Sequence, residues 1–216
     1  MDNLPFIAPG KRAIVSGRTG SGKSTLACWL LSRSSQHWLI LNPKHTAAYK
    51  DLPDCEVLTK FDDGLVSRSV EKHRFTLLNL SGAQSTPDYM DNIIQWFHET
   101  FENVGLCVDE TYTLHIGGKA GDGLVGWLTR GRELKQSFLG LAQRPKWLSL
   151  FCFSESDYIV EMDLTISDDR KRVFDFTGNQ ESLNRLLPHR WLWYDVGSDT
   201  LAKYGPVPRL DKVENM

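Results

Sequence analysis

The chain has 216 residues, of which 41% are hydrophobic and 24% charged, and its formal net charge is -2. This composition is typical of a globular protein, and the length predicts a single domain over residues 1–216. The charge excludes a protein that binds nucleic acid through an overall positive field, so any contact with DNA must come from a local patch.

Strands and helices are expected to alternate from the N-terminus onward. A short strand at Lys11–Ser16 leads into a glycine-rich loop, and residues 24–33 carry apolar side chains at helical spacing. His37–Leu41 is a second expected strand, and Phe75–Leu80 is a third. Residues 44–60 have a mixed pattern that predicts no element.

The second half continues in the same way. A helix is expected from about Pro87, since proline is tolerated in a first turn and a broad apolar face follows. Val104–Val108 and Ser137–Ala142 are expected strands, with a short helix before the second of them. The last third is expected to contain strands at Tyr158–Met162 and Trp191–Val196 and helices around 167–175 and 179–187.

This alternation predicts the α/β class, with a mostly parallel central sheet covered by helices on both faces in three layers. The ligand of such a sheet lies beyond the carboxyl ends of the strands. The residues at those ends are therefore the candidates for a functional site.

Residues 17–25 read GRTGSGKST and match the pattern G-x-x-x-x-G-K-[ST] between a strand and a helix. In this pattern the backbone amides and the helix N-terminus hold phosphates, Lys23 reaches the β- and γ-phosphates, and Ser24 offers its hydroxyl to magnesium. A plain glycine turn before a helix is the alternative. The predicted ligands are ATP and Mg²⁺, and the predicted nucleotide-binding residues are Gly17, Arg18, Thr19, Gly20, Ser21, Gly22, Lys23, Ser24 and Thr25.

An acidic pair closes the apolar strand that ends at Val108. Asp109 is expected to hold the magnesium, and Glu110 to orient and deprotonate the attacking water. The alternative is a solvated strand end. Gln143 follows the next strand and could bond the γ-phosphate or that water. A water-activating glutamate favours hydrolysis over phosphoryl transfer to another acceptor.

The segment Arg130–Pro145, RGRELKQSFLGLAQRP, resembles the FtsK–HerA superfamily of ring-shaped DNA translocases, in which an arginine precedes a strand that ends in a glutamine. Ser154–Leu164 and Trp191–Val196 are similar to the closing strands of that family. The resemblance implies a P-loop NTPase fold of the ASCE/RecA-like type. The bare ATPase core resembles the genome-packaging ATPases of membrane-containing icosahedral (tectivirus-like) viruses.

That resemblance implies further properties. Gln143 matches the sensor of the family, and Arg132, eleven residues earlier, matches an arginine that reaches the ATP of a neighbouring subunit; Arg130 is the nearby rival. The implied partners are double-stranded DNA, other copies of the chain in a ring (a hexamer or pentamer) and capsid or portal-vertex proteins. The glycine-rich segment 117–126 fits either a pore loop with Lys119 on DNA or a plain connection.

The implied location is the host cytoplasm or the packaging vertex of the virion. No apolar run approaches the roughly 18 residues of a membrane-spanning helix, so no membrane span is expected. The four cysteines include no C-x-x-C pair, which argues against a zinc site. The tryptophans are expected mostly in the core, and Lys44 gives only a faint signal for nucleic acid.

Two other functions remain open. A nucleotide or small-molecule kinase would need a lid with clustered arginines, which the sequence does not show. A nucleotide-switched phage assembly factor would share the phosphate loop. Inorganic phosphate as the product would distinguish hydrolysis from the first, and turnover stimulated by DNA would argue against the second.

Overall fold

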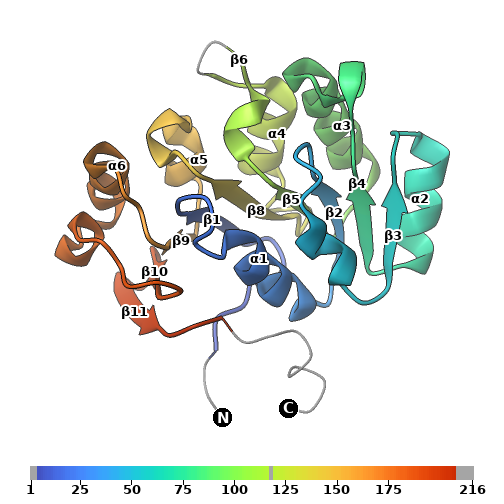
Figure 1. The fold of residues 1–216 in the computed structure, drawn as a ribbon. Coiled ribbons are helices and arrows are strands. Elements are labelled where there is room, and N and C mark those ends of the chain that lie inside the picture. Colours follow the sequence, from blue (N-terminus) through green and yellow to red (C-terminus); the bar gives the residue numbers. More distant parts are fainter. Residues whose placement is uncertain (1–3, 117–118, 208–216) are drawn as a thin grey trace.

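The computed structural model describes residues 4–116 and 119–207 and is organised around a nine-stranded sheet (Figure 1). In spatial order its strands are β11 (Thr200–Tyr204), β10 (Trp191–Asp195), β9 (Tyr158–Glu161), β1 (Arg12–Ser16), β8 (Ser137–Ala142), β5 (Val104–Val108), β2 (His37–Leu41), β4 (Phe75–Leu78) and β3 (Cys55–Leu58). Neighbours from β9 to β3 pair in parallel, and β10 pairs antiparallel with both β9 and β11. The predicted mostly parallel α/β sheet is confirmed.

Helices cover both faces of this sheet. The α-helices are α1 (Lys23–Ser32), α2 (Asp63–Lys72), α3 (Pro87–Thr100), α4 (Asp122–Arg130), α5 (Leu150–Ser154) and α6 (Ser167–Thr177). Short 3-10 turns lie at η1 (Ala47–Asp51), η2 (Gly82–Ser85), η3 (Thr111–Leu114), η4 (Pro145–Trp147) and η5 (Gln180–Leu183), and β6 (His115–Ile116) pairs with β7 (Lys119–Ala120). Helix α1 packs in one apolar cluster and the helices α2 to α6 in the other, which confirms the three layers.

Side chains on the inner strands alternate between these two clusters. On β1, Ala13 and Val15 pack with α1, whereas Ile14 packs on the opposite face. Because both faces are covered, these strands are apolar throughout and were readily predicted from the sequence. The carboxyl ends of the parallel strands then emerge together at one edge of the sheet.

The structure differs from the predicted elements mainly at the edges. The helix expected at 179–187 is only the turn η5, because the backbone leaves the helical conformation at Asn184, which is extended (φ −96°, ψ 154°). Gly178, with φ +61°, ends α6 just before it. The elements β3, α2, α5 and β11 were not predicted.

Part of the glycine-rich segment 117–126 has a packing role. The Asp91 carboxylate on α3 accepts hydrogen bonds from the amides of Gly123 (2.8 Å) and Leu124 (2.9 Å) at the start of α4. A Cβ at Gly121 would lie 2.3 Å from Cγ of Asp91, so the absence of a side chain permits this contact. Gly117 and Gly118 lie outside the described residues.

Gly105 on β5 lies directly against the ring of Trp38 on β2. A Cβ built at Gly105 would lie 2.2 Å from Cδ2 of Trp38, which is fully buried. We predict that Gly105→Ala lowers the free energy of unfolding by about 3 kcal/mol, because the ring and backbone must separate in a packed core. Chemical denaturation measures this. Gly205→Ala, where a Cβ meets nothing within 4 Å, is the matched control and should unfold like the wild type.

Glu161 is a buried carboxyl group at the end of β9, in register with Ser16 on β1. Neither of its side-chain oxygens has a hydrogen-bond partner, and burial raises the pKa of Glu161 from 4.5 to about 8. The folded protein therefore retains a proton that the unfolded chain releases across this range.

We predict that the free energy of unfolding falls as pH rises from about 4.5 to about 8, because the folded state binds the extra proton and loses this advantage on deprotonation. The loss is on the order of a few kcal/mol, because each unit of pKa shift corresponds to about 1.4 kcal/mol. Glu161→Gln should flatten the decline in denaturation curves recorded across this pH range. Parallel curves for the two proteins would contradict the assignment.

Candidate functional site

The loop between β1 and α1 is held at both neighbouring strand ends. The Gly17 amide donates to the carbonyl of Ala142 at the end of β8 (3.1 Å), and the Arg18 amide donates to the carbonyl of Asp163 beyond β9 (2.8 Å). Gly20 and Gly22 have φ of +77° and +98°, a conformation that glycine adopts at little cost. The predicted phosphate loop is thus a tightly bent segment that begins a helix.

Lys23 is buried at the first position of α1. Its ammonium donates to the carbonyls of Gly17 (2.8 Å) and Arg18 (3.1 Å), so it fastens the loop from inside. Burial lowers the pKa of Lys23, while the nearby carboxylates of Glu110 and Asp109 oppose this shift. The Lys23 side chain lines the hollow in front of the loop, where a phosphate would enter.

A hollow of about 430 Å³ opens in front of this loop at the carboxyl edge of the sheet. It brings together residues from the loops after β1, β2, β5 and β8, as expected for a parallel sheet. The lining residues are Thr19, Gly20, Gly22, Lys23, Ser24, Thr25, Lys44, Thr46, Asp109, Glu110 and Gln143. The predicted Lys23, Ser24, Asp109, Glu110 and Gln143 therefore share one hollow, together with Lys44 and Thr46, to which the sequence analysis gave no role here.

The acidic pair is buried and each carboxylate has one partner from the loop after β2. Asp109 accepts a hydrogen bond of 2.6 Å from the Thr46 hydroxyl, and burial raises the pKa of Asp109 against that bond. Glu110 lies 3.1 Å from the Lys44 ammonium through Oε1, while Oε2 is buried with no partner. An unpaired buried carboxylate oxygen is costly, which is typical of a functional group awaiting a ligand.

The backbone at Glu110 is also unusual. Its φ is +66°, and a non-glycine residue pays roughly 1–3 kcal/mol for a sparsely populated conformation of this kind. The Glu110 carbonyl accepts from the amide (2.9 Å) and hydroxyl (2.8 Å) of Thr113, which fixes the turn η3. This turn directs the Glu110 side chain away from solvent and toward Lys44.

Gln143 begins the segment that follows β8, and its side-chain oxygen accepts from the Thr19 hydroxyl of the phosphate loop (3.0 Å). Arg144 is turned away, donating to the buried Asp169 carboxylate (2.7 Å) and lying 4.4 Å from the centre of the Trp147 ring. Trp147 is 52% exposed, whereas most of the other tryptophans are buried, as expected.

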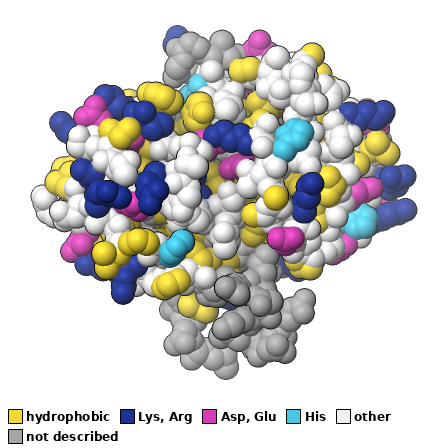
Figure 2. Space-filling model, viewed as in Figure 1, with side chains coloured by type: hydrophobic (Ala, Val, Ile, Leu, Met, Phe, Trp, Pro, Cys, Tyr) yellow, Lys and Arg dark blue, Asp and Glu magenta, His cyan; other side chains and the backbone are white. Residues whose placement is uncertain are grey.

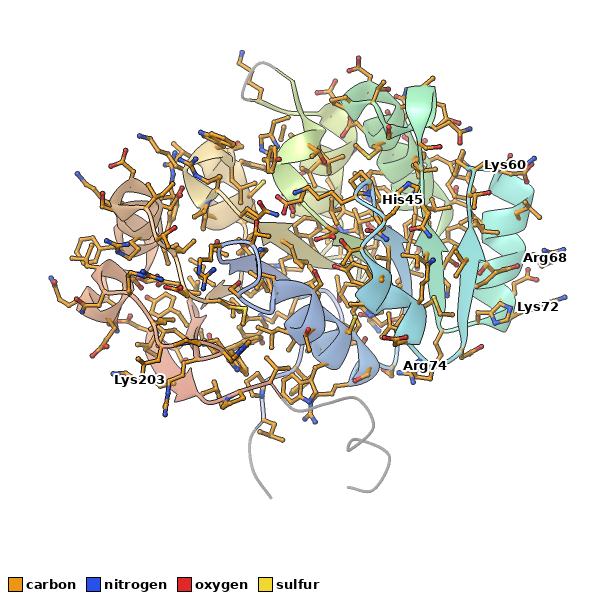
Figure 3. The ribbon with its side chains drawn as sticks, viewed as in Figure 1. His45, Lys60, Arg68, Lys72, Arg74 and Lys203 are labelled. Atoms are coloured by element: carbon orange, nitrogen blue, oxygen red, sulfur yellow. The ribbon has the colours of Figure 1, made fainter. Side chains whose placement is uncertain are left out.

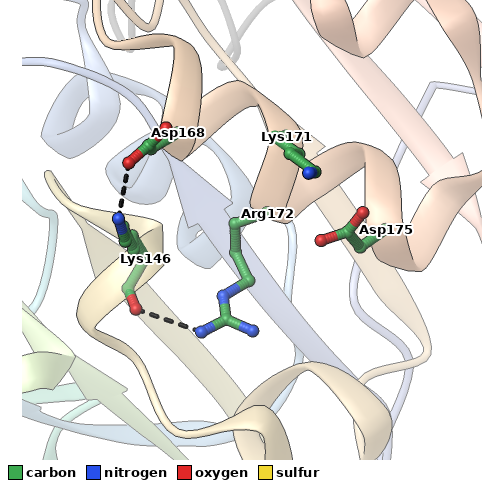
Figure 4. Close-up of a pocket in the computed structure, with 5 residues that line it drawn as sticks. All are labelled: Lys146, Asp168, Lys171, Arg172 and Asp175. Atoms are coloured by element: carbon green, nitrogen blue, oxygen red, sulfur yellow. Dashed lines mark hydrogen bonds and ion pairs between the residues drawn. The ribbon is translucent and has the colours of Figure 1, made fainter.

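Figure 4 shows a second hollow beside this segment, lined by Lys146, Asp168, Lys171, Arg172 and Asp175. Lys146 pairs with Asp168, and Arg172 donates to the Lys146 carbonyl, so these charges join η4 to α6. On the face drawn in Figure 2, lysine and arginine side chains gather over the part of the molecule where α6 lies. Of the cations that line this hollow, Lys146 is compensated by the carboxylate of Asp168.

Asp163, just beyond β9, is a structural contact of the loop that the sequence analysis missed. Its buried carboxylate accepts from Arg18 (2.7 Å) and from Arg185 (2.6 and 3.0 Å). These arginines, Arg185 first, lower the pKa of Asp163. The position of an aspartate at the end of a strand beside the loop was the only sequence signal for this role.

The two candidate arginines precede β8, so they lie at the amino end of that strand, whereas the hollow lies at its carboxyl end. Arg132 follows α4, is mostly exposed, and lies 3.4 Å from Asp157. Arg130 lines a different hollow with Glu99 and Glu133. Strand β8 separates Arg132 from Gln143 by roughly 20 Å, so neither arginine reaches the hollow of its own chain.

Lys119 lies on β7 among acidic neighbours. It lines a hollow with Asp88, Asp91 and Asp122. These carboxylates compete with DNA phosphate for its charge, which weakens the hypothesis that Lys119 contacts DNA from a pore loop.

The described residues form neither a cluster of metal-binding side chains nor a membrane-spanning helix. Between residues 4 and 207, leaving out 117–118, no group of three or more His, Cys, Asp or Glu side chains is arranged to hold a metal ion. A magnesium site here would therefore depend on Ser24, Asp109 and the nucleotide. None of the helices described has the length and apolarity needed to cross a membrane.

No family model matches the sequence. The chain is 28% identical over 225 residues to the DNA packaging ATPase P9 of Enterobacteria phage PRD1, an alignment that covers 94% of this chain and 90% of P9. Among solved structures, it is similar to the genome packaging NTPase B204 of Sulfolobus turreted icosahedral virus 2 in complex with ATP-gammaS, with a TM-score of 0.75 and 17% identity over 94% of this chain and 100% of B204.

The fold is also shared with VirB4 of Thermoanaerobacter pseudethanolicus, with a TM-score of 0.71, 10% identity and 98% of each chain covered. These likenesses confirm the predicted P-loop ATPase fold. They also confirm the resemblance to viral packaging ATPases that was inferred from the sequence.

Proposed function

We propose that this chain is an ATPase that drives double-stranded DNA into a viral capsid. The observation that carries the proposal is the hollow in which Lys23, Ser24, Asp109, Glu110 and Gln143 meet. The whole-length similarity to a phage DNA packaging ATPase supports DNA as the substrate that is moved. The virion vertex or the host cytoplasm is the location that fits this role.

Binding of ATP follows from the loop. The amides of residues 17–25 and the N-terminus of α1 supply partial positive charge for the phosphates, and the Lys23 ammonium adds a full charge. Ser24 and Asp109 supply the oxygen donors that magnesium prefers, and they fit that ion. Bound magnesium would neutralise charge on the β- and γ-phosphates.

Hydrolysis requires a base close to the γ-phosphate. Glu110 offers a buried carboxylate whose Oε2 has no partner, so it can accept a proton from water. The water oxygen then bonds to the γ-phosphorus, the bond to the β-phosphate oxygen breaks, and ADP and inorganic phosphate form. Gln143, held by Thr19, is placed to orient that water or the γ-phosphate.

We predict that Lys23→Ala and Glu110→Gln each lower the rate of phosphate release by at least about a hundredfold, because one removes a phosphate ligand and the other the base. Steady-state ATPase assays with and without double-stranded DNA measure this. Lys72→Ala, on α2 at the far edge of the sheet in Figure 3, is the control and should retain the wild-type rate.

The same assay separates the alternatives. A phosphorylated acceptor in place of inorganic phosphate would support a kinase. Nucleotide binding without turnover, with or without DNA, would support an assembly switch. Stimulation of phosphate release by DNA supports the packaging function.

The proposed assembly is a ring, a hexamer or pentamer, that docks at capsid or portal-vertex proteins. Its support is the position of Arg132, which is exposed and far from the hollow of its own chain. In a ring this arginine would approach the nucleotide of the next subunit and stabilise the charge of the transition state. Arg130 is the alternative for that role.

We predict that Arg132→Ala lowers turnover by about a hundredfold or more, yet regains activity when mixed with Lys23→Ala subunits. A site is active when an Arg132→Ala subunit supplies the hollow and the neighbouring Lys23→Ala subunit supplies the arginine. In an equal mixture this arrangement occurs at about a quarter of the sites, so the mixture should reach about a quarter of the wild-type rate. The rate of mixed oligomers measures this. If Arg132→Ala were fully active and Arg130→Ala had lost its ATPase activity, the arginine that acts on the next subunit would be Arg130.

A further inference from the structure

The loop after β2 is a rigid arm at the edge of the hollow. The Asn42 side chain donates to Asn79 (2.7 Å) and to the Thr46 carbonyl (3.1 Å), and it accepts from the Thr46 amide (2.9 Å). His45, labelled beyond the end of β2 in Figure 3, lies 3.0 Å from the Leu80 carbonyl through Nε2. These bonds fix the backbone from which Lys44 and Thr46 extend.

This arm contacts both acids of the site. Thr46 donates a short hydrogen bond to Asp109, and the Lys44 ammonium pairs with Oε1 of Glu110 at 3.1 Å. The two contacts differ in kind, since the hydroxyl is neutral and the ammonium is charged. The Lys44 ammonium occupies Oε1 of Glu110, so a water molecule cannot use that oxygen while the contact persists.

Of these two contacts, the ion pair between Lys44 and Glu110 is the one that can more easily break. Its side chain is 39% exposed, whereas the Glu110 side chain is 2% exposed, so the ammonium lies at the mouth of the hollow. An ion pair this exposed on one side is weak. The lysine stem is flexible, and Lys44 lines the same hollow as the phosphate loop.

The other cation of the hollow is less free. Lys23 is buried and donates to two loop carbonyls, so its position is fixed by the loop. The terminal phosphate of ATP brings a larger negative charge to the mouth of the hollow than the Glu110 carboxylate carries. Lys44 is therefore the ammonium best placed to exchange one anion for the other.

We propose that Lys44 is a positioning residue that pairs with Glu110 in the nucleotide-free protein and moves to the γ-phosphate when ATP binds. The move frees Oε1 as well as Oε2 of Glu110 for the attacking water, and it occurs only when a γ-phosphate is present. With ADP the ammonium stays on Glu110. The inference rests on the proposed ATPase function and adds to it the group that links nucleotide state to the base.

A double-mutant cycle in nucleotide binding tests this exchange. Four proteins are compared: the wild type, Lys44→Met, Glu110→Gln and the double variant. Isothermal calorimetry measures their affinity for the magnesium complexes of ATPγS and of ADP. Matching thermal denaturation curves establish that the four proteins are folded alike.

Glu110→Gln should tighten ATPγS binding about five- to tenfold more when Lys44 is present than when Met replaces it, a coupling of about 1.0–1.4 kcal/mol. The reason is that only the wild-type lysine must first leave a carboxylate. ADP should show no such coupling, because it has no γ-phosphate. Lys44→Arg, which preserves the charge, should restore the coupling with Glu110→Gln.

Equal tightening by Glu110→Gln in both backgrounds would overturn the proposal, since it would mean that Lys44 remains on Glu110 in the complex. The same coupling with ADP as with ATPγS would overturn it too, because the γ-phosphate would then be irrelevant. A wild-type chain that binds neither nucleotide would instead contradict the proposed ATPase itself.

Discussion

The site depends on two backbone hydrogen bonds that pin the phosphate loop between neighbouring strands. Gly17 donates to the end of β8 and Arg18 to the segment beyond β9, so the loop cannot unbend without breaking the edge of the sheet. The same two strand ends carry Gln143 and Asp163, which bond Thr19 and the Arg18 guanidinium. The loop is therefore held through main chain and side chain on both sides. Such preorganisation is what allows a bent main chain to present its amides to phosphate without reordering at the moment of binding.

The charged side chains in the hollow balance one another through a small number of contacts. Two carboxylates, Asp109 and Glu110, face two ammonium groups, Lys23 and Lys44. Each ammonium contacts protein oxygens: Lys23 bonds loop carbonyls and Lys44 bonds Glu110. On the proposal made above, a triphosphate competes for these same donors, and nucleotide binding redistributes contacts that the structure already contains. This redistribution is a physical route by which occupancy of the hollow can alter the state of the base.

The inner part of the fold and the acidic pair were predictable from the sequence because their signals are local. Strands such as Val104–Val108 are apolar on both faces, and a glycine-rich loop between a strand and a helix has few other uses. The edge elements β3 and β11 are partly exposed, so their side chains carry no such run of apolar residues. Lys44 could not be assigned either, because the role proposed for it arises from its contact with Glu110, 66 positions later in the sequence, which the pairing of β2 with β5 brings about.

The distribution of arginine bears on why the site should be shared between subunits. Among the described residues that line the hollow, the cations are Lys23 and Lys44, and neither is an arginine. Arg18, within the loop, has its guanidinium on Asp163, and Arg144, next to Gln143, has its guanidinium on Asp169. The nearby arginines are thus engaged in holding the scaffold, while Arg132, at the other end of β8, is 58% exposed and pairs only loosely with Asp157 at 3.4 Å. A planar guanidinium suits the spread charge of a phosphoryl transition state better than an ammonium does. If hydrolysis uses one, the chain must obtain it from a neighbour, and turnover would then be tied to assembly by the placement of these side chains.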